Sequence, residues 1–203
     1  MSLRGSVRVM SRLGPWQPET TEARLDRLES LAEIQQLPVR YALALDSRDM
    51  DMMVSLFTPD VRVGREQSGR EALRAWFVKT LSEPKVSVHF VGNHVIDFDD
   101  ADHAHGIVYC HDELGRPNGG WDEGMLQYWD TYVRVATPEG REWCFDRRKF
   151  LRWYMVDALE RPAHGAGVGE GHDALTTNQL PDAFESWRRF WDEVGVEPPS
   201  PSR

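Results

Sequence analysis

The feature that most constrains the fold is a run of long alternating segments in the second half of the chain. Residues 86–98, 103–114, 124–135 and 142–155 alternate apolar and polar side chains, and turn or loop sequences separate them. This pattern predicts antiparallel strands joined as hairpins. Because helical patterns come before this run, the order is typical of an α+β domain.

Helical patterns occupy the first half of the chain. Apolar residues recur at three-residue spacing over 25–37 and continue as an apolar helix to Asp46, with Pro38 expected to kink it or start a new turn. Further short elements are predicted at residues 49–57 (helix), 61–63 (strand) and 71–81 (helix, opened by a capping box of Ser68 and Glu71).

The chain divides into three parts by composition. We expect a flexible arm over residues 1–20, one folded domain over 21–157, and an extension over 158–203. The extension begins with a glycine-rich loop at 161–173 and ends in an amphipathic helix at 182–194, whose aromatic face must cover another surface.

Composition limits the classes of partner. The formal net charge is −9 without a cluster of Lys or Arg, which argues against nucleic acid. The sequence contains neither an apolar run long enough for a membrane helix nor a signal peptide, so we expect a cytoplasmic protein. Cys110 and Cys144 stand in strand-like segments without a CxxC spacing, which favours free core thiols over a disulfide or a metal site.

A candidate base lies on the first long strand. Strict alternation places His89, Val91 and Asn93 on one face, and His89 and Asn93 point into a cavity if the valine marks the interior. A buried His with a carboxylate partner is a natural general base. Asp46, at the end of an apolar helix, is the candidate partner; alternatively, it caps the next turn of the chain.

Further polar residues share apolar strand faces. Asp112 alternates with Val108 and Cys110, so it is either a second pocket carboxylate or a strand-end residue in solvent. Arg148 and Arg152 share a face of the last strand and could bind a carboxylate or a developing negative charge. An ordinary surface ion pair is the alternative for one of the two.

Two other types of site are not favoured. His103 and His105 share a strand face at a spacing that could bind zinc, but their neighbours place them opposite Asp112, so we interpret them as an exposed patch. The glycines of 161–173 lack the strand-then-helix context of a phosphate-binding loop. We therefore expect neither a metal nor a cofactor.

The order of these segments resembles the SnoaL-like branch of the nuclear-transport-factor-like superfamily. That superfamily includes polyketide cyclases, ketosteroid isomerase, scytalone dehydratase, hexachlorocyclohexane dehydrochlorinase and bile acid 7α-dehydratase. The similarity runs from about Leu25 to Tyr154 and is carried by LDRLESLAEIQQL, RYALALDSRD, VSVHFVGNHVIDF, GIVYCHDE, YWDTYVR and WCFDRRKFLRWY. It implies a cone-shaped, curved antiparallel sheet, an α+β barrel, wrapped around N-terminal helices.

The resemblance also implies a set of site residues. In the dehydratases and the dehydrochlorinase, an Asp that ends the first helix pairs with a His early on the first long strand, and Asp46 and His89 match these positions. Bile acid dehydratase has pocket residues that match Tyr41, Asp112 and Arg152, whereas the arginine of the dehydrochlorinase falls on Arg148. The chain departs from scytalone dehydratase at Leu45 and Leu114, which argues against a scytalone-type substrate, and from the dehydrochlorinase at Tyr41, where that enzyme has a Lys.

The function implied is a cofactor-independent lyase that dehydrates a hydroxylated, largely apolar ring compound such as a steroid or polyketide. His89 would remove a proton from carbon, Asp46 would hold the imidazolium, Tyr41 and Asp112 would assist the leaving oxygen, and an arginine would steady negative charge. The expected substrate-binding residues are Asn93, Val91, Cys110, Val108, Phe57 and Trp76. The alternatives are an isomerase or polyketide cyclase with the same base, or a non-enzymatic binding or assembly subunit. We expect a homodimer or homotrimer.

Overall fold

The computed structural model describes residues 14–138, 140–158, 180, 181 and 183–197. Its helices are α1 (Thr21–Ser47), α2 (Met50–Ser55), α3 (Arg70–Leu81) and α4 (Glu185–Val194). Its strands are β1 (Arg62–Val63), β2 (Gln67–Ser68), β3 (Val86–Phe98), β4 (His103–Gly115), β5 (Trp121–Thr137) and β6 (Gly140–Asp157).

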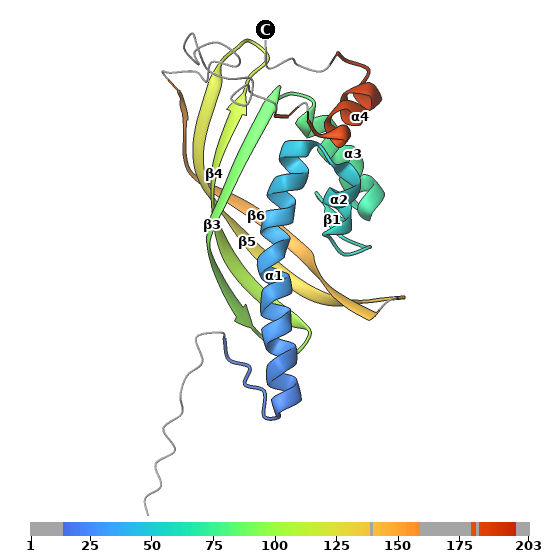
Figure 1. Ribbon diagram of the computed structural model, residues 1–203, viewed down its shortest axis with the longest axis vertical. Coiled ribbons are helices and arrows are strands. Elements are labelled where there is room, and N and C mark those ends of the chain that lie inside the picture. The colour runs from blue at the N-terminus through green and yellow to red at the C-terminus, as the bar shows by residue number, and fades with distance from the viewer. Residues whose placement is uncertain (1–13, 139, 159–179, 182, 198–203) are drawn as a thin grey trace, which may run out of the picture.

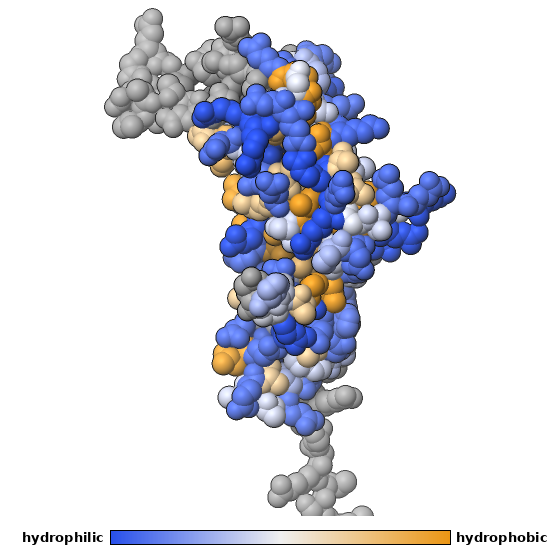
Figure 2. All heavy atoms as spheres, turned by 90° about the vertical axis from the view of Figure 1, so that its right-hand side faces the viewer, coloured by the Kyte–Doolittle hydropathy of each residue, from blue (hydrophilic) through white to orange (hydrophobic). Residues whose placement is uncertain are grey.

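The four long strands form one antiparallel sheet in the order β3-β4-β5-β6, so each strand pairs with its neighbour in the sequence. The sheet is curved and not closed, and α1, α2 and α3 lie on its inner side (Figure 1). The side of the molecule that carries α2 and α3 is largely hydrophilic, with scattered apolar residues (Figure 2). The predicted α+β class and the helix-filled cone are therefore confirmed, with an open sheet in place of a closed barrel. The predicted division of the chain at residues 20 and 157 stays a prediction.

Alternation along the strands produces the core. On β4 and β5, every second residue is buried against the helices, as a sheet with one covered face requires. The outer face keeps large exposed side chains such as Phe90, Trp129 and Tyr154. An outer face of this kind is compatible with the predicted homodimer or homotrimer, which stays a prediction to be checked by light scattering.

A β-bulge interrupts the alternation on β3. Val91 pairs with Cys110 and His94 pairs with Val108, so two residues of β3 oppose one residue of β4. Asn93 is exposed as a result, and His94 takes the inner face. The prediction that Asn93 points into the cavity is wrong for this reason.

Two predictions about helices have different outcomes. Pro38 does not divide α1, which continues through it to Ser47, while the predicted kink stays a prediction. The lost backbone hydrogen bond is tolerated because Leu37 and Tyr41 bury that part of the helix in the core. The capping box does not form, because Ser68 pairs with Arg62 in the β1–β2 hairpin and Gly69, at φ 95°, caps α3 without a side-chain bond.

The helix predicted at 182–194 is confirmed as α4, which begins at Glu185. Most of the predicted arm and the glycine-rich loop at 161–173 lie outside the described residues. Within the described parts of the chain, no helix has the length and apolar character needed to span a bilayer.

Candidate active site

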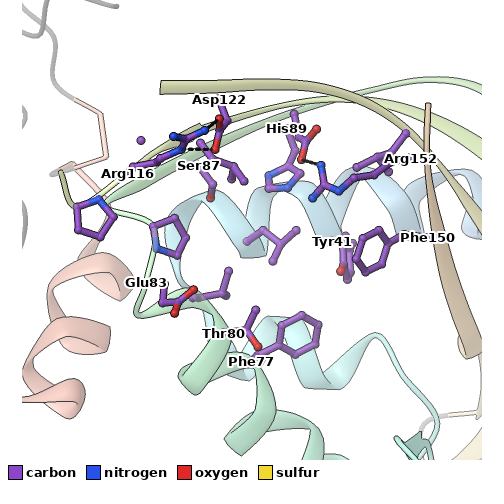
Figure 3. A pocket seen from close by; sticks show the side chains of 18 of the residues that line it. Tyr41, Phe77, Thr80, Glu83, Ser87, His89, Arg116, Asp122, Phe150 and Arg152 are labelled. Atoms are coloured by element: carbon purple, nitrogen blue, oxygen red, sulfur yellow. Dashed lines mark hydrogen bonds and ion pairs between the residues drawn. The ribbon is translucent and has the colours of Figure 1, made fainter. Parts of the chain in front are cut away.

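A cavity of about 690 Å³ opens between the inner face of the sheet, the end of α1 and α3 (Figure 3). Tyr41 and Leu45 reach it from α1, Phe77 from α3, and His89 and Arg152 from the sheet. Its volume is in the usual range for a pocket that encloses a small organic molecule. Apolar rings and a few convergent polar groups form its wall.

The Asp46 carboxylate holds His89 at two points. Asp46 Oδ1 lies 2.7 Å from His89 Nδ1, and Asp46 Oδ2 accepts a hydrogen bond of 2.8 Å from the His89 backbone N–H. Because a carboxylate can only accept, Nδ1 carries a proton, and in the neutral imidazole Nε2 then has the lone pair. The predicted contact between helix end and strand is therefore present, and its geometry is that of an oriented base.

A second carboxylate, paired with an arginine, lies beside His89. Asp112 is the direct cross-strand neighbour of His89, and its buried Oδ2 accepts a hydrogen bond of 3.3 Å from Arg152 Nη1. The Arg152 side chain remains about one-third exposed, and Figure 3 shows it reaching toward His89. The guanidinium therefore lines the pocket as a partly exposed cation paired with Asp112.

Gly124 makes room for this pair. It is the neighbour of Asp112 on β5, and a Cβ built on it would overlap Asp112 Oδ1 and lie 3.2 Å from Arg152 Nη1. We expect Gly124→Ala to displace both side chains and to lower the free energy of unfolding by about 1–3 kcal/mol, measured by chemical denaturation.

Gly92→Ala is the matched control, because a Cβ there meets no atom within 4 Å. The explanation would be contradicted if Gly124→Ala were as stable as Gly92→Ala and Asp112 were unmoved in its crystal structure. Gly124 would then not be needed to make room for the Asp112–Arg152 pair.

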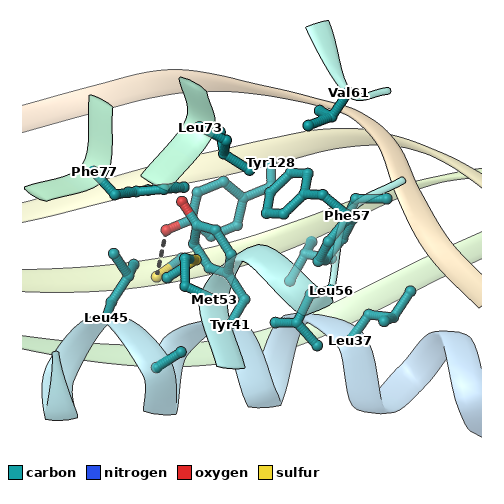
Figure 4. Packing of buried hydrophobic residues seen from close by; sticks show 14 of the residues in the cluster. Leu37, Tyr41, Leu45, Met53, Leu56, Phe57, Val61, Leu73, Phe77 and Tyr128 are labelled. Carbon is teal, nitrogen blue, oxygen red and sulfur yellow. Dashed lines mark hydrogen bonds between the residues drawn. The ribbon is translucent and has the colours of Figure 1, made fainter. Parts of the chain in front are cut away.

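Tyr41 belongs to both the pocket and the core beneath it. Its ring packs edge-on against Phe57, Phe77, Tyr128 and Phe145 at centroid distances between 5.6 and 6.2 Å (Figure 4). Burial raises the pKa of Tyr41 to about 12, with the charge of Arg148 acting in the opposite direction. The hydroxyl thus stays protonated near neutral pH and can donate a hydrogen bond.

The same ring cluster corrects most of the predicted substrate-binding residues. Trp76 lines the pocket, whereas Phe57, Val108 and Cys110 are buried in the core and Val91 packs partly buried against it. Tyr41 and Tyr128 line the pocket instead: Tyr41 packs against Phe57, and the Tyr128 hydroxyl donates a hydrogen bond to Cys110 Sγ.

Arg148 is also separated from the pocket. Its guanidinium donates to both oxygens of Asp130, at 2.8 and 2.6 Å, and lies about 4 Å beneath the ring centres of Tyr41, Tyr128 and Phe145. Burial opposes its charge, but the charge and hydrogen bonds of Asp130 outweigh burial and raise the pKa of Arg148. The sequence named both Arg148 and Arg152 as candidates and left open which of them faces the pocket. Arg152 lines the pocket, and Arg148 does not.

The sequence model of the SnoaL-like domain matches residues 26–149, well over half of the chain. The chain belongs to the SnoaL-like family. No curated protein matches it in sequence.

Solved structures share the fold of this SnoaL-like domain. A hexachlorocyclohexane dehydrochlorinase, LinA type 2, is 20% identical with a TM-score of 0.59, covering 66% of this chain and 93% of its own. The LinA-type3 enzyme from Novosphingobium barchaimii LL02 is 21% identical with a TM-score of 0.59, covering 67% and 94%. A proposed scytalone dehydratase from Novosphingobium aromaticivorans is 22% identical with a TM-score of 0.54, covering 70% and 94%.

Sequence reasoning missed several residues of the SnoaL-like pocket. Ser87, which donates to Asp46 Oδ1 at 3.2 Å, shares the strand parity of His89, and Phe150 shares that of Arg152. At one end of the pocket, Arg116 donates to Asp122 and so joins the two sides of the β4–β5 loop (Figure 3). An arginine within the GRPNGG segment and an aspartate two residues after it were the available signal for this pair.

A buried polar chain continues below the pocket floor of the SnoaL-like domain. The Tyr132 hydroxyl donates to Asp130 Oδ2 at 3.0 Å and therefore accepts from His94 Nε2, also at 3.0 Å. His94 Nδ1 is buried without a hydrogen-bond partner in the described part of the chain. Charging His94 would place a proton on that nitrogen, and burial accordingly lowers the pKa of His94 to about 4.

His94 is expected to make stability depend on pH. Its pKa is about 6.5 in the unfolded chain and about 4 in the folded protein, so the unfolded state binds the extra proton as pH falls between these values. We expect the melting temperature to fall over this window and to fall less steeply in His94→Gln. Identical slopes for wild type and His94→Gln would contradict the prediction.

Proposed function

We propose that the protein is a cofactor-independent lyase that removes water from a hydroxylated, largely apolar ring compound such as a steroid or a polyketide. The observation that carries the proposal is the Asp46–His89 hydrogen bond in the wall of an apolar pocket of about 690 Å³. The names of two structural neighbours, a dehydrochlorinase and a proposed dehydratase, both describe eliminations and support the same class of reaction.

In the proposed reaction, His89 Nε2 takes a proton from a carbon next to the one that bears the hydroxyl. The electrons of that C–H bond form the new double bond, the C–O bond breaks, and the leaving oxygen accepts a proton and departs as water. Asp46 stabilises the imidazolium that forms, because its carboxylate already accepts a hydrogen bond from the Nδ1–H group. The proton that the leaving oxygen accepts is the one that His89 removed from carbon, so its transfer returns His89 to the resting state.

Two other residues of the pocket wall are suited to assist departure of the oxygen. The Tyr41 hydroxyl, kept protonated by burial, can hydrogen-bond the leaving oxygen. The Arg152 guanidinium can stabilise negative charge that develops there, with Asp112 holding it in place. These roles for Tyr41, Arg152 and Asp112 belong to the proposal.

The test is incubation of the protein with a panel of hydroxysteroids and hydroxylated polyketides, followed by mass spectrometry of the products. Loss of one water from a substrate supports the lyase. A new product of unchanged mass assigns the site to an isomerase or cyclase instead. Tight binding across the panel without any product would move the assignment to a binding or assembly protein.

A further inference from the structure

Helix α4 lies beyond the residues that the SnoaL-like model matches, yet it packs against the end of α1 that carries Asp46 (Figure 1). Its aromatic residues Trp187, Phe190 and Trp191 are at most 3% exposed. Ser186 donates a hydrogen bond of 2.8 Å to the carbonyl of Ser47, the residue after Asp46. The helix therefore packs against the end of α1, next to the residue that follows Asp46.

Arg48 connects α4 to the Asp46–His89 pair, which we call the dyad. This residue ends α1 in the left-handed region, at φ 55°, and is 1% exposed. Its guanidinium lies 4.9 Å from the ring centre of Trp187 and 5.9 Å from that of Phe190. Burial lowers the pKa of Arg48 to about 10, while the charge of Asp46 favours the charged form, so the side chain remains a cation near neutral pH.

The Arg48 guanidinium joins the end of α1 to the start of β3. Nη1 donates to the Leu45 carbonyl and, at 2.6 Å, to Ser87 Oγ, while Nη2 donates to the Pro84 carbonyl at 3.2 Å. A serine hydroxyl has one proton, and the approach of Arg48 occupies its acceptor side. The Ser87 proton is thereby directed to Asp46 Oδ1, 3.2 Å away.

We propose that Arg48 is a positioning residue for the Asp46–His89 dyad and that α4 holds it in place, so that the C-terminal extension contributes to catalysis without touching the substrate. The inference rests on the proposed role of the dyad. Hydrogen bonds from Arg48 through Ser87 fix the Asp46 carboxylate, which in turn fixes the plane of the His89 ring. The reaction rate falls steeply when a catalytic base is displaced by about 1 Å from its reactive position.

A matched pair of variants tests the proposal. Arg48→Lys keeps the charge but removes the fork that reaches Leu45, Ser87 and Pro84 together. Arg134→Lys is the control: Arg134 is also mostly buried, lies 5.1 Å from the ring centre of Trp143 and pairs with Asp26, which belongs to the first half of α1. Both variants lose a stacked, multiply bonded guanidinium, but only Arg48 is linked to the dyad by hydrogen bonds, through Ser87.

The first readout needs no substrate. The His89 Nδ1 proton, held against Asp46, should give a downfield proton NMR resonance, assigned by its absence in His89→Gln. We expect Arg48→Lys to weaken or shift this resonance and Arg134→Lys to leave it unchanged, although both proteins melt at lower temperature. An unchanged resonance in Arg48→Lys, or the same change in both variants, would overturn the proposal.

The second readout uses any substrate found in the panel. We expect Arg48→Lys to lower kcat by about 10–100-fold with KM changed by less than about two-fold, because orientation of the base is lost and the pocket wall is kept. Equal kcat values for Arg48→Lys and Arg134→Lys would overturn the proposal. A changed resonance without turnover of any compound would leave the positioning role intact and refute the lyase instead.

Ser87→Ala keeps the test decisive if Arg48→Lys does not fold. It removes the hydroxyl between Arg48 and Asp46 and preserves the packing of Arg48 on α4. We expect the same change in the His89 resonance, in a smaller degree. A wild-type resonance in Ser87→Ala would show that the chain of hydrogen bonds from Arg48 has no influence on the dyad.

Discussion

His89→Gln is expected to lower kcat by about 10²–10⁴-fold, the usual contribution of a general base. The glutamine side chain can still accept or donate a hydrogen bond next to Asp46, so the substitution removes basicity with little change in packing around a side chain that is only 9% exposed. The measurement is steady-state turnover of the substrate that the panel identifies. Turnover at the wild-type rate would sink the proposed mechanism.

The same strand supplies the control. His94 also lies on the inner face of β3, but it bonds Tyr132 and does not line the pocket. His94→Gln should therefore leave kcat within about three-fold of wild type, since it removes no group that contacts the substrate. Equal losses in His89→Gln and His94→Gln would mean that disturbance of β3, and not loss of a base, explains the result.

Asp46→Asn probes the partner of the base. The amide can donate to Nδ1, which would move the imidazole proton to Nε2 and leave no lone pair facing the pocket. A loss on the order of 10⁴-fold accompanies the equivalent change in a Ser-His-Asp triad, and a comparable loss is expected here. A mild effect would mean that Asp46 only anchors the β3 backbone through the His89 N–H.

Local patterns were enough to single out Asp46 and His89 as candidates, whereas their pairing was what the family resemblance implied. Asp46 follows from the end of an apolar helix, and His89 follows from strand parity before any irregularity. Strand parity failed at Asn93, because the bulge consists of Gly92 and Asn93. A bulge is set by how two strands and the helices behind them fit, and a glycine in the strand was its only local signal.

The two arginines of β6 show a different limit. Both Arg148 and Arg152 face inward, as alternation predicts, but they sit at different depths of the cone. Bulges on β6 next to Asp146 and Trp153 also alter the parity there. The deciding partner of Arg148 is Asp130, which stands among the inward apolar residues of β5 and could have been recognised as a buried carboxylate in need of a cation.

The pocket wall was the least predictable part of the site. Its floor is formed by rings from α1, α3 and the sheet that meet around Tyr41, so the depth at which the pocket stops depends on side-chain volumes from separate segments. Strand parity correctly placed Val108 and Cys110 on the inner face, but it could not show that rings cover them.

Removal of Arg148 is expected to produce the largest loss of stability. Asp130 is fully buried, and Arg148 donates to both of its oxygens while its guanidinium lies among three aromatic rings. Arg148→Met preserves much of the packing volume but leaves the carboxylate with the Tyr132 hydroxyl as its remaining side-chain donor among the described residues. Loss of one partner of a buried pair costs about 3–5 kcal/mol, and we expect a decrease of that size in the free energy of unfolding.

The double variant Arg148→Met with Asp130→Asn separates the cause from simple loss of packing. An asparagine can still accept the Tyr132 hydrogen bond and carries no charge, so the double variant should recover about half of the loss or more. Urea denaturation of the two single variants and the double variant provides the comparison. A double variant no more stable than Arg148→Met would assign the loss to the ring contacts of the guanidinium. Recovery of stability in the double variant would instead show that the Arg148 guanidinium beneath Tyr41 serves chiefly to neutralise Asp130. This role explains why Arg148 does not line the pocket, so that Arg152 is the arginine available to a substrate.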